Sequence, residues 1–146
     1  MIVLVGGQTR KVGKTRAVCD IIAATREARW IAVKVSPHAH APVDRETDTD
    51  RYLAAGAADA MIVRELPVLP ADRNLIIESN SASDKVKPDV FVFLADPLQS
   101  EWKESARRVI ARADYVVKGL VTPPVIARIS ELLRSSQPGS PLGQSG

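Results

Sequence analysis

Short apolar runs alternate along the chain with longer segments in which apolar residues recur at helical spacing. The runs predict strands at residues 2–5, 30–35, 60–65, 74–79, 89–96 and 115–119. The spaced segments predict helices at residues 14–27, 48–55, 97–114 and 123–134. Several of the runs are apolar at successive positions, which is typical of strands buried on both faces of a parallel sheet. The alternation predicts a three-layer α/β fold with a mainly parallel sheet flanked by helices.

The chain of 146 residues is long enough for one domain with a substantial core and too short for two. We predict this domain at residues 1–134. Residues 135–146 read S-S-Q-P-G-S-P-L-G-Q-S-G, rich in Ser, Gly and Pro, and predict a disordered tail.

The charge balance narrows the range of ligands. The net charge is +3 and no run of five or more like charges occurs. A mild, dispersed positive charge suits an anionic small molecule such as a nucleotide, and it excludes an extended nucleic-acid interface.

The single cysteine, Cys19, precludes an intramolecular disulfide, and we expect a reducing, cytoplasmic location. We interpret Cys19 as a small core residue. No stretch of about 18 apolar residues is present, so no membrane partner is expected.

A glycine-rich segment lies between the first predicted strand and the first predicted helix. Gly7 and Gly13 enclose five residues and are followed by Lys14 and Thr15. The standard phosphate-binding loop has four residues between its glycines, but the same strand before it and helix after it. The enclosed residues are Gln8, Thr9, Arg10, Lys11 and Val12.

This segment predicts a site for the triphosphate of ATP or GTP. Backbone amides of the loop and of the helix N-terminus would face phosphate oxygens. The Lys14 ammonium would contact the β- and γ-phosphates, and the Thr15 hydroxyl would bind Mg²⁺. The alternative is a glycine-rich turn that contains Gly-Lys-Thr by chance.

The longer spacing resembles the loop of dethiobiotin synthetase, which reads G-T-x-T-x-V-G-K-T. Val12, Gly13, Lys14 and Thr15 match its last four positions, and Thr9 aligns near a threonine. The extra residue therefore resembles the mark of a subgroup of phosphate-loop proteins.

Residues 34–57 resemble a second family, the molybdopterin-guanine dinucleotide biosynthesis protein B proteins. The chain departs from that family in alternating its histidines with alanine and in replacing the acidic loop by P-V-D-R-E-T. The phosphate loop of this chain is also one residue longer than the loop usual in that family. The matching positions are Lys34, His38, His40, Asp48-Thr49 and Ala55-Gly56-Ala57.

Several side chains of this segment are candidates for the second half of a site. Lys34 is either a second cation for a substrate phosphate or carboxylate, or a surface lysine at the sheet edge. His38 and His40 lack further ligands for a zinc site, so we expect them to contact ligand or solvent. Asp48 is a candidate for an indirect Mg²⁺ ligand or for the residue that organises the attacking group. The alternative is that Asp48 or Thr49 is only the N-cap of the following helix.

Two later strands end in candidate residues. Glu78 ends an apolar run and is predicted to face Thr15 and the metal; the resemblance to the protein B family, where this segment reads V-E-G, supports the same role. The alternative is a strand-end ion pair. Lys118 follows the last strand and is a candidate contact for the nucleotide base. Asp96-Pro97 is expected to begin a helix.

The hypothesis that follows is Mg²⁺-dependent binding and hydrolysis of ATP or GTP, accessory to molybdopterin-type cofactor biosynthesis, with Lys14, Asp48 and Glu78 as the catalytic residues. One alternative is a small-molecule kinase or ligase of the dethiobiotin synthetase type, in which Lys34 and His38 bind the acceptor. The other is a nucleotide-binding module without catalysis that acts through a partner protein. A homodimer that closes the site is a further hypothesis.

Overall fold

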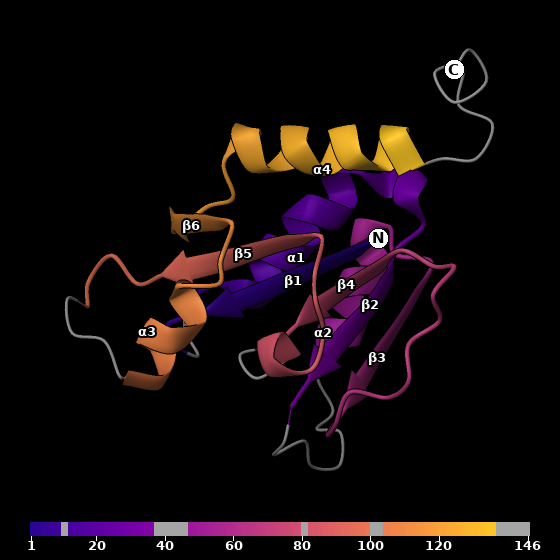
Figure 1. The fold of residues 1–146 in the computed structure, drawn as a ribbon. Helices are drawn as coiled ribbons and strands as arrows, with labels where there is room; N and C mark the ends of the chain where they lie inside the picture. The colour runs from indigo at the N-terminus through magenta and orange to yellow at the C-terminus, as the bar shows by residue number, and fades with distance from the viewer. Residues whose placement is uncertain (10–11, 37–46, 80–81, 100–103, 137–146) are drawn as a thin grey trace.

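The computed structural model describes residues 1–9, 12–36, 47–79, 82–99 and 104–136. The strands in these ranges are β1 (Ile2–Gly7), β2 (Ile31–Val35), β3 (Asp59–Val63), β4 (Leu75–Glu78), β5 (Val90–Ala95) and β6 (Tyr115–Lys118). The helices are α1 (Lys14–Ala24), α2 (Asp48–Ala55), α3 (Glu104–Ile110) and α4 (Pro123–Ser136), with 3₁₀ turns at Arg26–Ala28 and Ala82–Asp84. Figure 1 shows the sheet at the centre and helices on both sides of it.

All the strands pair in parallel, in the order β3-β2-β4-β1-β5-β6. The predicted α/β fold with a parallel sheet is therefore confirmed. Strand β4 lies between β1 and β2, so those two consecutive strands are not neighbours. The register sets Glu78 beside Val5 on one side and beside Lys34 on the other. Lys34 and Glu78 thus lie side by side at the carboxyl edge of the sheet.

Each face of the sheet has its own apolar core. Helices α1, α2 and α4 cover one face, where Val5, Ile21, Tyr52 and Ile129 belong to one buried cluster. Helix α3 and the chain segments around β4 cover the other face, over a cluster that includes Phe91. This arrangement, visible in Figure 1, leaves the carboxyl ends of the strands at one edge of a sandwich.

The chain leaves neighbouring strands in opposite directions at that edge. After β1 it passes to the face covered by α1, whereas after β4 and β5 it passes to the other face. Strand β1 lies between β4 and β5. The segment that follows Gly7 therefore begins at the point where neighbouring connections run to opposite faces of the sheet. In open α/β sheets this divergence is where ligands bind.

Two predicted helices are shorter than expected. The helix predicted at 14–27 ends at Ala24, since the buried Thr25 hydroxyl donates to the Ile21 carbonyl at 2.6 Å and accepts from the Trp30 indole at 2.9 Å. These bonds stabilise a turn in place of another helical residue. The helix predicted at 97–114 is described only over α3, and Asp96 accepts from the Leu98 amide in a turn rather than beginning a helix.

The last helix is longer than predicted. Helix α4 continues to Ser136, two residues past the predicted domain boundary, and in its last turn the Ser135 hydroxyl donates to the Leu132 carbonyl at 3.1 Å. The rest of the predicted tail, residues 137–146, lies outside the described residues. Among the described helices, none combines the length and apolar character needed to cross a membrane.

The N-cap of α2 is Thr47, and the prediction of Asp48 or Thr49 in that role is wrong. The Thr47 hydroxyl accepts from the Asp50 amide at 3.3 Å, and the Asp50 carboxylate accepts from the Thr47 amide at 3.0 Å. This reciprocal pair satisfies two amides that the helix itself leaves unpaired. The Asp48 carboxylate therefore does not cap the helix, and it contacts Lys34 in the site described below.

We expect Thr47→Ala to destabilise the chain at neutral pH by about 1 kcal/mol, the usual cost of losing a hydroxyl N-cap. The hydrogen bond from the Thr47 amide lowers the pKa of Asp50 from its ordinary 3.8. The stabilising contribution of the Asp50 carboxylate is therefore present above pH 3.8 and is lost as the pH falls through the lowered pKa. Urea denaturation at pH 7 measures the cap, and an unchanged midpoint would contradict this assignment.

Candidate functional site

The glycine-rich segment is packed closely onto the end of β1. A Cβ atom on Gly7 would lie 2.5 Å from Val12 Cγ1 and 2.9 Å from Lys14 Cγ. Both distances are shorter than any carbon contact tolerates, so the side chains of Val12 and Lys14 fold back over this glycine. Gly7 is therefore required by the close approach of its neighbours, since its backbone is not in the left-handed region.

Gly13 is required for a different reason. Its φ of 93° lies in the left-handed region, which side chains other than glycine rarely adopt. This conformation turns the chain directly into α1, and a Cβ there would meet no atom of the described residues within 4 Å. No described atom therefore fills the position beside Gly13 at the helix N-terminus.

The N-terminus of α1 keeps its positive partial charge. Within the described ranges it receives no side-chain capping hydrogen bond, and its first turn contains no acidic residue. Most helices receive a Ser, Thr, Asp or Asn cap at this point. An uncapped helix start preceded by glycines is an arrangement that favours an anion.

Gln8 and Thr9 differ in how the fold uses them. The Gln8 carboxamide accepts from the Asp96 amide at 2.7 Å and donates to the Gln99 carbonyl at 3.3 Å, which ties the segment to the end of β5. The Thr9 hydroxyl oxygen is buried and has no hydrogen-bond partner among the described residues. An unsatisfied buried hydroxyl is costly, and among the described residues the Thr9 hydroxyl is a donor within the predicted loop that has no acceptor.

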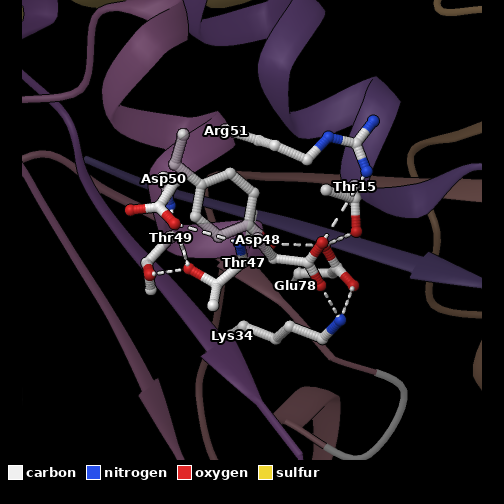
Figure 2. A network of polar contacts seen from close by, with 9 residues as sticks. Thr15, Lys34, Thr47, Asp48, Thr49, Asp50, Arg51 and Glu78 are labelled. Carbon is white, nitrogen blue, oxygen red and sulfur yellow. Dashed lines mark hydrogen bonds and ion pairs between the residues drawn. The ribbon is translucent and has the colours of Figure 1, made fainter. Parts of the chain in front are cut away.

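Thr15 and Glu78 meet at the centre of the site. The Thr15 hydroxyl donates to Glu78 Oε1 at 2.9 Å, joining the first turn of α1 to the carboxyl end of β4 (Figure 2). Glu78 is 4% exposed. A buried carboxylate must be paired or hydrogen-bonded, and this hydroxyl is one of its partners.

Lys34 lies between two carboxylates. Its ammonium contacts Asp48 Oδ2 in a short ion pair and lies 3.6 Å from Glu78 Oε2, as Figure 2 shows. Burial alone would lower the pKa of Lys34, but the Asp48 hydrogen bond and the charges of both carboxylates outweigh it, so this pKa is raised. Lys34 is therefore a half-buried, charged lysine at the carboxyl end of β2, and it is paired with carboxylates rather than fully exposed to solvent.

Helix α2 contributes two residues that the sequence analysis did not select. The buried Tyr52 hydroxyl donates to Glu78 Oε1, the same oxygen that Thr15 contacts. The Arg51 guanidinium lies 3.7 Å from Asp48 Oδ1. Burial and the Glu78 carboxylate raise the pKa of Tyr52 far above its ordinary value, so its hydroxyl stays protonated. The sequence did contain one indication of Tyr52: it follows Asp48 by four residues, so the two side chains lie on the same face of a helix.

Other predicted residues lie apart from this cluster or outside the description. Lys118 ends β6, an edge strand separated from β1 by β5, and is exposed. Arg10, Lys11, His38 and His40 lie outside the described residues. Cys19 packs half-buried against the core, as predicted, and burial raises the pKa of its thiol.

The cluster offers few protein ligands to a metal ion. In the described part of the chain, no three His, Cys, Asp or Glu side chains are grouped to hold a metal by themselves. Thr15 and Glu78 present one hydroxyl and one carboxylate, both hard oxygen donors. Mg²⁺ in nucleotide sites takes one or two such protein ligands and completes its shell with phosphates and water.

No family model, no curated protein and no solved structure matches this chain. The resemblances to dethiobiotin synthetase and to the molybdopterin-guanine dinucleotide B proteins thus stay predictions that rest on residues in the sequence.

Proposed function

We propose that the chain binds ATP or GTP with Mg²⁺ and hydrolyses it or transfers its terminal phosphoryl group. The observation that carries this proposal is the Thr15–Glu78 hydrogen bond. It joins a hydroxyl at an uncapped helix start to a buried carboxylate from the neighbouring strand. The sequence predicts both residues as ligands of one Mg²⁺ ion, and in the fold their side chains are in contact.

The phosphates would lie along the segment from Gly7 to Thr15. The close packing at Gly7, the left-handed Gly13 and the uncapped start of α1 support a backbone that accepts an anion. Lys14 would neutralise the terminal phosphates, and the Thr9 hydroxyl would have a phosphate oxygen as its acceptor.

A bound Mg²⁺ would neutralise charge that develops on the phosphoryl oxygens. Thr15 and Glu78 are the residues that would hold it, and their oxygen donors suit that ion. Lys34 holds the Asp48 and Glu78 carboxylates in place through its two ion pairs. Asp48 would orient the attacking hydroxyl or water, and its carboxylate is held by Lys34 on one oxygen and by Arg51 on the other.

The pathway assignment rests on the residue resemblance alone. An accessory role in molybdopterin-type cofactor biosynthesis follows from the match at Lys34, Asp48 and the Ala55-Gly56-Ala57 helix end. The second candidate, a kinase or ligase of the dethiobiotin synthetase type, rests in the same way on the resemblance of the segment from Gly7 to Thr15. A cytoplasmic location and a homodimer that completes the site belong to the same proposal.

Phosphate release from Mg-ATP and Mg-GTP by the purified chain tests the proposal, with Lys14→Ala as the matched variant. We expect turnover by the native chain. In the variant the rate of turnover should fall by about tenfold to a hundredfold, the effect of losing one charge-assisted contact to phosphate. Lys87→Ala removes an exposed cation of the same type just before β5, at the opposite edge of the sheet from the site, and it should retain far more of the activity.

Equal turnover by the native chain and Lys14→Ala would assign the activity to a contaminant and contradict catalysis. Nucleotide binding without turnover would instead support the third hypothesis, a module that acts through a partner protein.

A further inference from the structure

Glu78 Oε1 accepts two hydroxyl hydrogen bonds at once. Thr15 Oγ1 donates from α1 at 2.9 Å, and Tyr52 donates from α2 at shorter range. The other oxygen of the carboxylate faces the Lys34 ammonium at 3.6 Å. Three elements of the fold thus converge on one carboxylate that is almost completely buried.

The two hydroxyl donors are not equivalent under the proposed function. Thr15 lies at the start of α1, where its hydroxyl is the candidate Mg²⁺ ligand. A hydroxyl that binds a cation through an oxygen lone pair can still donate its proton, but its position is then set by the cation as well as by Glu78. Tyr52 has a buried ring that is 0% exposed, so its hydroxyl has no alternative partner in solvent and stays on Oε1.

The geometry points to Tyr52 as the positioning residue of this site: its hydroxyl holds the Glu78 carboxylate in orientation when Thr15 turns to the metal. This inference rests on the proposed function and adds a residue to it. Tyr52 acts through Glu78 and does not itself touch nucleotide. It also fixes α2, and with it Asp48, relative to β4.

The phenolic hydroxyl can be removed with little change in packing by Tyr52→Phe. We expect this variant to need about tenfold more Mg²⁺ for half-maximal nucleotide binding, in line with the loss of one hydrogen bond to a carboxylate. Nucleotide affinity in EDTA should equal that of the native chain. High Mg²⁺ concentrations should restore binding.

Tyr115→Phe is the matched control, because Tyr115 is the other of the two tyrosines and lies in β6 at the far edge of the sheet. The control should keep the native Mg²⁺ requirement. A purely structural role of Tyr52 would lower affinity equally in EDTA and in Mg²⁺, and that result would overturn the inference. So would a Tyr52→Phe chain with the native Mg²⁺ requirement.

A second measurement does not depend on the folding of Tyr52→Phe. In the Tyr115→Phe background, 3-fluorotyrosine labels Tyr52 alone, and its ¹⁹F resonance should shift when Mg-ATP or Mg-GTP is added but not with nucleotide in EDTA. A resonance that does not respond to Mg-nucleotide, in a chain that binds it, overturns the inference and leaves the proposed function standing. A native chain that binds no Mg-nucleotide overturns both.

Discussion

Gly7→Ala is expected to lower the affinity for nucleotide by about a hundredfold while the chain still folds. The new methyl group would lie 2.5 Å from Val12 Cγ1 and 2.9 Å from Lys14 Cγ, so both side chains must move. Lys14 would then leave the phosphates, and the amides between the two glycines would lose their common direction. A displacement of about 1 Å is enough to cost a hundredfold where several contacts converge.

Two other glycines distinguish this effect from general strain. Gly13→Ala and Gly119→Ala each place a side chain on a backbone with positive φ, of 93° and 85°, without any close contact to described atoms. Each should cost about 1–2 kcal/mol of stability. Gly119→Ala should bind nucleotide as the native chain does, because Gly119 lies beyond the edge strand β6. Native affinity in Gly7→Ala would contradict the predicted loop.

Lys34→Met is expected to lower the free energy of unfolding by about 2–3 kcal/mol. Removing one partner of a buried ion pair typically costs more, about 3–5 kcal/mol, because the remaining charge is left without compensation. Here the Lys34 side chain is 26% exposed, and solvent screens part of the loss. Glu78, 4% exposed, would keep the Thr15 and Tyr52 hydroxyls as its partners among the described residues.

The double variant Lys34→Met/Glu78→Gln tests the reason for this loss. Glutamine still accepts the hydroxyl hydrogen bonds but carries no charge, so the double variant should be more stable than Lys34→Met alone. Strictly additive losses in urea denaturation would show that the two residues are not coupled, contrary to the ion pair.

The pH range of the Lys34 effect follows from its pKa. Because the pKa of Lys34 is raised above 10.5, its contribution is fully present below that pH and is lost only as the pH rises through the raised value. The difference between the native chain and Lys34→Met should therefore be constant from neutral pH to about pH 9.

The positions of the strands could be predicted because each is a continuous apolar run with local boundaries. The order of the strands could not be predicted, since it depends on pairing between residues far apart in the chain. Nothing near Val5, Lys34 or Glu78 in the sequence indicates that β4 lies between β1 and β2. Local hydrogen bonds also decided boundaries, as at Thr25, where a hydroxyl shared with Trp30 ends α1 early.

The candidate site was predictable where a motif carries its own chemistry. The Gly-Lys-Thr start of α1 and the acid at the end of an apolar run selected Thr15 and Glu78, which the fold brings into contact. Tyr52 was missed because a tyrosine in an amphipathic helix is most simply a core residue. Its ring does lie in the core, and the hydrogen bond from its hydroxyl to Glu78 becomes visible only in the folded structure.

Calorimetric titration with Mg-ATP and Mg-GTP tests the central proposal most directly. We expect a heat of association with at least one of them in the native chain. Lys14→Ala, at unchanged thermal stability, should weaken that association by about tenfold to a hundredfold. A native chain that gives no heat with either nucleotide, or a Lys14→Ala chain that binds with native affinity, would contradict the proposed phosphate site.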